Sequence, residues 1–475
     1  MKEYISLAQV REDIGKGAIT CVELTENYIQ RIKSSNLNTF LEVFDVSAIE
    51  QSQIVDEKIK NGTAGRLAGM VIGLKDNICY KGHKVSSSSK ILEGFESIYN
   101  ATVVEKLLQE DAIIIGRLNC DEMAMGSSNE NSAYGPVLNP VQNNKVPGGS
   151  SGGSAAAVKA KLCLAALGSD TGGSIRQPAS FCGVVGYKPT YGRVSRYGLL
   201  AYASSFDQIG PLTNNIEDAA LITEIISGSD AYDSTCSTKP VEGYSNLRKT
   251  EPAPKYKIAY IKDCLEMAGL DKEIKAKTLE IIEKLKLEGH EVHGVDFPYL
   301  NYIVPNYYVL TTAEASSNLA RYDGIHFGYR SGKAEDVETT YVHSRSEGFG
   351  EEVQRRIMMG TFVLSAGYYD AFYTKGLKVR NIIKQKTEAI FNDYDFILLP
   401  TTPTPAFGIG ENIDDPITMY LQDIFTVHAN LAGIPAVSLP LGEHSNGLPF
   451  GMQLMAGTFQ DAKLFEFSDR LMNLG

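Results

Sequence analysis

Two stretches rich in glycine and serine hold the residue types best suited to do chemistry. Residues 148–158 read GGSSGGSAAAV, and residues 168–178 read GSDTGGSIRQP. Because glycine has no Cβ, the backbone N–H groups of such loops can come close to a bound ligand. Each stretch is followed by a helical segment, so the two loops offer converging N–H donors near serine hydroxyls. These are the components of an oxyanion hole, and we expect one here.

Three familiar motifs are tested and set aside. A phosphate-binding loop needs a Gly-Lys pair that neither stretch contains. Residues 148–152 fit G-x-S-x-G, but that nucleophile elbow must follow directly on a strand, whereas residues 139–147 are typical of a loop. Residues 87–90 fit S-x-x-K, but neither S-D-N nor K-T-G accompanies them. None of the three therefore defines the chemistry.

A serine nucleophile needs a base, and histidine is the usual one. All the histidines lie outside the glycine- and serine-rich stretches, at positions 83, 290, 293, 326, 343, 428 and 444. A lysine can take the proton instead if burial or nearby dipoles lower its pKa. Lys75 follows the apolar run 67–74 and precedes Asp76 and Asn77, where a buried strand would reach an active-site face. From its position alone, Lys75 could equally be an ordinary exposed lysine at a strand end.

Charge and cysteine content exclude several function classes. The 475 residues include 45 Lys and Arg against 57 Asp and Glu, a formal net charge of -12, with no basic block of five or more. Direct binding of a phosphate backbone needs clustered cations, so any nucleic acid would be held by another chain. The seven cysteines form no C-x-x-C pair, which indicates neither a metal site nor a disulfide framework. With no apolar run of about 20 residues and no signal peptide, we expect a cytoplasmic protein that makes no membrane contact.

The elements that must position these residues alternate between strand and helix. The first 35 residues predict two helices, with capping-box spacings at Ser6 with Gln9 and at Thr20 with Glu23. Short apolar runs predict strands at 67–74, 112–116, 162–168, 183–187, 257–261, 290–295, 395–405 and 434–441. Helical patterns cover 101–110, 154–161, 214–227, 271–289 and much of 310–390. We expect a single large α/β domain spanning 1–475, with a catalytic core at about 66–225 and a more charged outer βαβ segment at about 228–300.

Taken together, four segments resemble the amidase signature family. They are VIGLKDN at 71–77, PGGSSGGSA at 147–155, GSDTGGSIRQP at 168–178 and CGVVGYKPT at 182–190. The set is long, ordered and made of several parts. The resemblance implies a central mixed sheet covered by helices on both faces.

The resemblance also implies a serine–cis-serine–lysine triad. By motif position Ser174 is the nucleophile, Ser150 the bridging serine after a cis peptide bond, and Lys75 the base. Neutral Lys75 would accept the proton of Ser150, which accepts that of Ser174. The implied oxyanion-hole donors are the backbone N–H groups of Thr171, Gly172, Gly173 and Ser174.

Within the family, four further segments are similar to the glutaminase subunits of tRNA-dependent amidotransferases: 191–198, 205–211, 346–350 and 414–420. Such a subunit hydrolyses free glutamine and passes ammonia to a partner, which amidates misacylated tRNA with ATP and Mg²⁺. The resemblance thus implies a heterotrimer with subunits B and C, contact with tRNA only through the B subunit, and no cofactor in this chain.

For the two charged ends of glutamine, the resemblance implies Arg356 for the carboxylate and Asp423 for the amino group, with Tyr307 lining the pocket. The neighbouring Arg355 leaves an offset of one residue open, and each charged residue could instead belong to a structural ion pair.

Two other functions remain open on the residues themselves. A free-standing amidase acting on small carboxamides would use the same Lys75, Ser150 and Ser174. A scaffold that keeps only the fold is disfavoured, because it has no reason to keep a lysine at a buried strand end.

Overall fold

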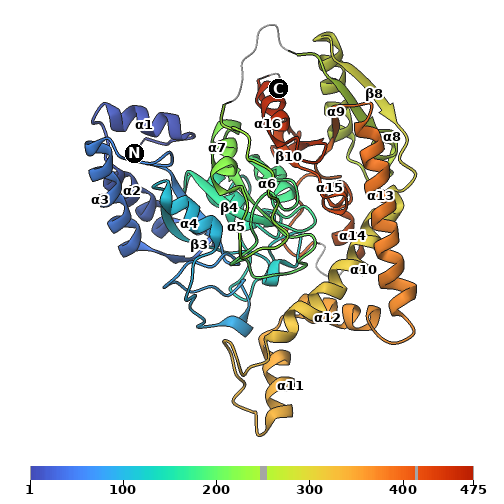
Figure 1. Cartoon of the computed structure of the whole chain (residues 1–475), viewed down its shortest axis with the longest axis horizontal. Helices are drawn as coiled ribbons and strands as arrows, with labels where there is room; N and C mark the ends of the chain where they lie inside the picture. Colours follow the sequence, from blue (N-terminus) through green and yellow to red (C-terminus); the bar gives the residue numbers. More distant parts are fainter. Residues whose placement is uncertain (1, 247–253, 412–415, 474–475) are drawn as a thin grey trace.

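The computed structural model describes residues 2–246, 254–411 and 416–473 (Figure 1). Asp414 and Asp415, part of one segment used for the resemblance, lie outside the described residues. Within the described chain, no helix is both long and apolar enough to cross a bilayer.

An 11-stranded sheet runs through the molecule in the order β1-β3-β2-β4-β6-β5-β10-β11-β9-β7-β8. Strand β2 pairs in parallel with β3 and β4, and β7 pairs in parallel with β8 and β9, whereas the other pairs are antiparallel. The sheet is therefore mixed, as expected. The strands are β1 (Phe40–Val43), β2 (Val71–Lys75), β3 (Ile113–Leu118), β4 (Ala165–Asp170), β5 (Val185–Lys188), β6 (Gln208–Thr213), β7 (Lys257–Ile261), β8 (Glu291–Val295), β9 (Phe396–Pro400), β10 (Ala436–Glu443) and β11 (Pro449–Ala456).

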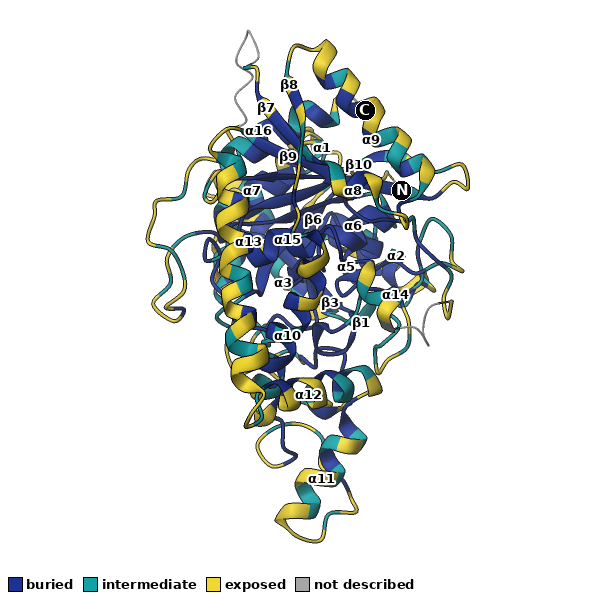
Figure 2. Cartoon of the chain, turned by 90° about the vertical axis from the view of Figure 1, so that its right-hand side faces the viewer, coloured by how far each residue is buried: buried dark blue, intermediate teal, exposed yellow. Residues whose placement is uncertain are grey.

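Helices cover the sheet, and Figure 2 shows its inner strands in dark blue at the centre of the molecule, whereas the edge strand β8 is partly exposed. Helices α5 and α6 pack together against the central strands, and α7 and α16 form a second group that also packs on the sheet. The helices are α1 (Leu7–Gly15), α2 (Cys21–Ser34), α3 (Asp45–Asn61), α4 (Thr102–Gln109), α5 (Gly152–Lys159), α6 (Arg176–Cys182), α7 (Ile216–Ile226), α8 (Lys262–Glu266), α9 (Lys272–Leu287), α10 (Leu300–Asn318), α11 (Val337–Gly348), α12 (Glu351–Val363), α13 (Lys375–Phe391), α14 (Pro416–Leu421), α15 (Val427–Ala432) and α16 (Asp461–Met472).

Helices α10, α12 and α13 pack on one another beside the sheet, and α11 projects away from it (Figure 1). This region was expected to be helical from 310 to 390, and it is, but turns and a loop divide it into separate helices. The division matters for function because α12 carries Arg356 on an element of its own.

Strands β1, β6 and β11 were not expected from the sequence. Strand β1 has only four residues, and both β6 and β11 contain proline and glycine, which are typical of turns. Their place in the sheet is fixed by neighbours far away in the chain: β6 lies between β4 and β5, and β11 between β10 and β9.

The first two helices begin as their capping signals predict. Thr20 Oγ1 accepts from the N–H of Glu23 at 3.1 Å, and Glu23 Oε2 accepts from the N–H of Thr20 at 2.8 Å. Ser6 Oγ likewise accepts from the N–H of Gln9, but the Gln9 side chain accepts from Ile5 instead of Ser6. Only the second capping box is complete.

Thr20→Ala removes the threonine half of this capping box and leaves the N–H of Glu23 without its side-chain acceptor. We expect a loss of about 1 kcal/mol in the free energy of unfolding. Urea unfolding followed by circular dichroism measures it, with Thr20→Ser as the matched control that keeps the hydroxyl. Equal midpoints for the Ala and Ser variants would contradict the role of the box.

Candidate active site

Lys75 ends β2, and Asp170 ends the parallel neighbour β4, so the carboxyl ends of these strands meet at one edge. Lys75 is fully buried. Its Nζ donates to Ser150 Oγ at 2.7 Å, Ser151 Oγ at 3.0 Å and Ser169 Oγ at 3.0 Å. The alternative of an exposed strand-end lysine is therefore wrong.

Burial lowers the pKa of Lys75 to about 8, although nearby acidic groups oppose the shift. Those groups are Cys120, Asp121, Asp170 and Asp207. Desolvation penalises the ammonium form, and among the described residues no carboxylate contacts Nζ directly to offset that penalty. A substantial neutral fraction thus exists near physiological pH, as a base requires.

Ser150 follows a cis peptide bond, Gly149–Ser150. Gly149 has no space for a side chain, because a Cβ there would overlap the carboxylate of Asp121. The N–H of Asp121 donates to the carbonyl of Ser150 at 3.2 Å, and the N–H of Gly149 donates to Gln177 Oε1 at 2.9 Å. These contacts hold the Ser150 hydroxyl against Lys75.

Ser174 lies on the neighbouring loop, just before α6. Its carbonyl accepts from the N–H of Ser151 at 3.1 Å, which joins the two loops. Ser174 is 9% exposed, whereas Lys75 and Ser150 are 0% exposed. No hydrogen bond of its Oγ to another described residue is present. The structure thus shows Lys75 and Ser150 in contact and Ser174 nearby with its hydroxyl unengaged.

Residues 171–174 carry the expected oxyanion-hole donors. Within the described chain, the N–H groups of Thr171, Gly172 and Ser174 have no partner and remain available. The N–H of Gly173 is engaged instead, since it donates to Asp170 Oδ1 at 2.9 Å. A Cβ on Gly172 would lie 2.6 Å from the Tyr307 ring, and one on Gly173 would overlap Thr426.

A buried ion pair between Asp170 and Arg176 flanks the loop 171–174 on both sides in the sequence and anchors it. Arg176 Nε donates to Asp170 Oδ2 and Nη2 to Asp170 Oδ1, each at 3.0 Å, with both side chains fully buried. Burial opposes ionisation of Asp170, yet the charge and hydrogen bonds of Arg176 hold its pKa at about 2. Arg176 Nη1 also donates to the Thr426 carbonyl at 2.9 Å. The sequence motif contains both residues, but the motif alone gave neither of them a role.

Arg356, on α12, is buried and faces the same region. Its Nε donates to Glu352 Oε1 at 2.8 Å, and its Nη1 donates to the hydroxyl of Tyr202 at 3.0 Å. Its guanidinium also lies 5.2 Å from the ring centre of Tyr308. The neighbouring Arg355 has a side chain 36% exposed and pairs with Glu351 and Glu352. Of the two arginines considered, Arg356 therefore faces the interior.

Asp423, just before α15, is the second charged group of this region. Its Oδ2 accepts from the hydroxyl of Ser127 at 2.7 Å. Burial raises the pKa of Asp423 to about 7, while Ser127 and the charge of Arg356 favour the carboxylate. Tyr307 lies against Gly172 of the oxyanion loop, and Arg356 and Asp423 are both close enough to Tyr307 to influence the pKa of its phenol, so the three expected substrate residues come together from three separate elements.

The sequence analysis did not predict four residues that hydrogen-bond the expected site residues: Ser127, Ser169, Tyr202 and Asp121. Ser169 lies inside the 168–178 motif, where its serine type was a usable signal. Tyr202 and Ser127 reach Arg356 and Asp423 from 154 and 296 residues away, so no local pattern could have found them.

Chemically, the arrangement suits acyl transfer: a free serine hydroxyl, a buried lysine with a lowered pKa, and open N–H groups for an oxyanion. Among the described residues no group of three His, Cys, Asp or Glu side chains could hold a metal ion.

Arg176→Met should destabilise the fold strongly, because it leaves the Asp170 carboxylate buried without its cation. Breaking one side of a buried pair typically costs about 3–5 kcal/mol. Urea unfolding measures the change, and the matched control is Lys16→Met, which breaks the exposed pair with Glu12 and should leave the free energy of unfolding nearly unchanged. Similar losses in the two variants would show that the Asp170 pair does not anchor the loop.

Comparison with known proteins shows the family to which this chain belongs. A profile of the amidase family matches residues 23–465. The A subunit of glutamyl-tRNA(Gln) amidotransferase from Chlorobium phaeobacteroides is 48% identical over 463 residues, covering 97% of each chain. The A subunit of the same enzyme from Thermotoga maritima, known from a crystal structure, is 41% identical with a TM-score of 0.77, over 94% of this chain and 93% of that one. A peptide amidase from Stenotrophomonas maltophilia is 27% identical with a TM-score of 0.81, over 98% and 96%. The resemblance inferred from the motifs is confirmed, and this chain belongs to the amidase family.

Proposed function

We propose that this chain is the glutaminase component, the A subunit, of a tRNA-dependent amidotransferase and that it hydrolyses free glutamine. The observation that supports the proposal is a buried cation and a buried carboxyl group, Arg356 and Asp423, both near Tyr307. A free amino acid presents a carboxylate and an ammonium group, and these two side chains complement both charges. The likeness to the A subunits over nearly the whole chain supports the same conclusion.

The proposed reaction proceeds through a glutamyl ester. Neutral Lys75 takes the proton of Ser150, Ser150 takes that of Ser174, and Ser174 Oγ attacks the side-chain amide carbon of glutamine. For this step the Ser174 hydroxyl must turn towards Ser150, a movement of the kind that accompanies substrate binding. The N–H groups of Thr171, Gly172 and Ser174 hold the oxyanion, and the proton on the lysine returns through Ser150 to the departing ammonia. Water then cleaves the ester to glutamate.

The ammonia would pass to a partner. In this proposal the chain works in the cytoplasm in a heterotrimer with subunits B and C. The B subunit binds the tRNA and uses ATP and Mg²⁺ to convert Glu-tRNA(Gln), or Asp-tRNA(Asn), to its amide. The net charge of -12 supports a chain that leaves tRNA to its partner. No cofactor is proposed in this chain.

A free-standing amidase is the second candidate, and one observation favours it. Two solved amidases that are 27% identical reach TM-scores of 0.83 and 0.81, above the 0.77 of the A subunit from Thermotoga maritima. Lys75, Ser150 and Ser174 would serve either enzyme, so substrate choice separates the two.

Ser174→Ala should reduce ammonia release from glutamine by about 10³-fold or more, because no other group replaces the nucleophile. Ammonia is measured with glutamine and with propionamide, for the chain alone and with its co-purifying partners. Glutamine-selective release that increases with partners supports the proposal. Equal turnover of propionamide by the lone chain would make it a free-standing amidase. Full activity in Ser174→Ala would show that Lys75, Ser150 and Ser174 are not the catalytic triad.

The rate of glutamine hydrolysis should rise with pH. Lys75 must be neutral, so its active fraction increases as pH passes its pKa of about 8. Asp423 must be ionised, so its active fraction increases as pH passes its pKa of about 7. We expect the pH profile of kcat/KM to show two ionisations, one from each residue. Asp423→Asn should remove the ionisation near pH 7 and leave the one near pH 8. A rate that falls between about pH 7 and 9 would contradict Lys75 as the base.

A further inference from the structure

Glu122 connects the catalytic loops to the helix that carries Arg356. It is 2% exposed and lies in the short turn that follows β3. Its Oε2 accepts from the N–H of Gly350 at 2.8 Å, across 228 residues of chain, and its Oε1 accepts from the hydroxyl of Ser89. Gly350 is the residue that immediately precedes α12.

This contact replaces a cap that α12 lacks. In a capping box, the side chain three residues into the helix would accept from the N–H of Gly350. That position is Val353, which is apolar and fully buried, and Gly350 itself has no side chain to cap the helix. The carboxyl group of Glu122 supplies the missing acceptor, and although burial raises the pKa of Glu122 to about 7, the hydrogen bonds from Ser89 and Gly350 favour its ionised form.

The Glu122 carboxyl group approaches Gly350 so closely that any side chain at position 350 would displace it. A Cβ on Gly350 would overlap Glu122 Oε2, although the backbone angles of Gly350 (φ -71, ψ 168) suit any residue. The turn that carries Glu122 is itself strained, because Met123 and Ala124 have φ values of 51 and 59. Non-glycine residues keep such angles only where the surroundings enforce them, which is common at functional sites.

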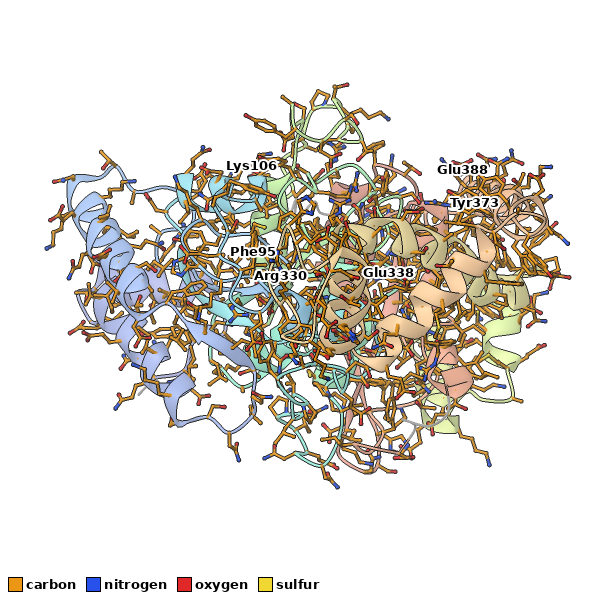
Figure 3. All side chains as sticks on the ribbon, turned by 90° about the horizontal axis from the view of Figure 1, so that it is seen from below. Phe95, Lys106, Arg330, Glu338, Tyr373 and Glu388 are labelled. Atoms are coloured by element: carbon orange, nitrogen blue, oxygen red, sulfur yellow. The ribbon has the colours of Figure 1, made fainter. Side chains whose placement is uncertain are left out.

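Further contacts join the segment that precedes α11 to the loop after β2. The rings of Phe95 and Phe327 lie 5.7 Å apart, and the N–H of Tyr329 donates to the Ile91 carbonyl at 2.9 Å. Figure 3 shows the side chains from below, with Phe95 and Arg330 among those labelled. Glu122 and Ser89 belong to the loops that follow β3 and β2, whereas Gly350 belongs to the start of α12.

We propose that Glu122 is a positioning residue for glutamine recognition: it fixes the start of α12 against the catalytic loops and so places Arg356 at the substrate carboxylate. The same loop already serves the other two parts of the site. The N–H of Asp121 donates to the carbonyl of Ser150, and the hydroxyl of Ser127 donates to Asp423. With Glu122 included, the loop 121–127 contacts Ser150, the start of the helix that carries Arg356, and Asp423. One loop thus aligns the bridging serine with the residues proposed to bind both ends of the substrate.

This inference rests on the proposed role of Arg356, and its test uses the chain with its co-purifying partners. Glu122→Ala should raise KM for glutamine about tenfold and change kcat less than about twofold, because it displaces a binding group and leaves the triad in place. Glu122→Gln keeps an acceptor for Gly350 and should restore KM to within about threefold of the original value. When Glu122→Ala is combined with Ser174→Ala, the Kd for glutamine measured by calorimetry should increase by the same factor as KM.

Two further variants keep the test decisive if Glu122→Ala does not fold. Gly350→Ala should reproduce the rise in KM, because its Cβ displaces the Glu122 carboxylate. Glu351→Ala is the matched control: it removes an exposed carboxylate from the same helix end and should leave KM unchanged.

Arg356→Ala separates this inference from the proposed function. If Arg356→Ala leaves KM unchanged, the proposed glutamine site fails. If Arg356→Ala raises KM while Glu122→Ala and Gly350→Ala do not, or if they lower kcat with KM unchanged, the positioning role of Glu122 is overturned.

Discussion

The burial of Lys75 among hydroxyl groups is the constraint on which the site depends. A fully buried lysine contacted only by serine oxygens has a lowered pKa, and a lowered pKa lets it act as a base without histidine. The position at the end of β2, between β3 and β4, makes that burial possible. In the proposed reaction the mixed sheet serves the base directly, because it excludes water from the amine of Lys75.

The remaining architecture aligns two loops and three helical elements with that lysine. The Asp170–Arg176 pair holds the oxyanion loop from inside the protein, and Asp121 fills the space that Gly149 leaves open. The residues proposed to bind the substrate come from α10, α12 and the segment before α15. The Asp170–Arg176 and Glu352–Arg356 pairs compensate the desolvation of their buried charges, whereas burial raises the pKa of Asp423 to about 7.

The sequence predicts the parts of the site that are local in the chain. Lys75, Ser150 and Ser174 lie in compact motifs, and Thr20 with Glu23 predicts the capping box of α2. Gly173 was expected as an oxyanion donor, but its N–H is taken by Asp170, a competition that spacing cannot show. Strands β6 and β11 were missed because tertiary pairing overrides their proline and glycine. Contacts such as Tyr202 with Arg356 and Glu122 with Gly350 join distant segments, so only the folded structure shows them.

The central claim is that Ser174 forms a glutamyl ester, and trapping that ester is the most direct test. Acid quenching of the chain and its partners during turnover of glutamine, followed by peptide mass spectrometry, should find one glutamyl group on the peptide that contains Ser174. The same peptide should stay unmodified in Ser174→Ala. Turnover with no adduct on Ser174, or an adduct on a different peptide, would contradict the account.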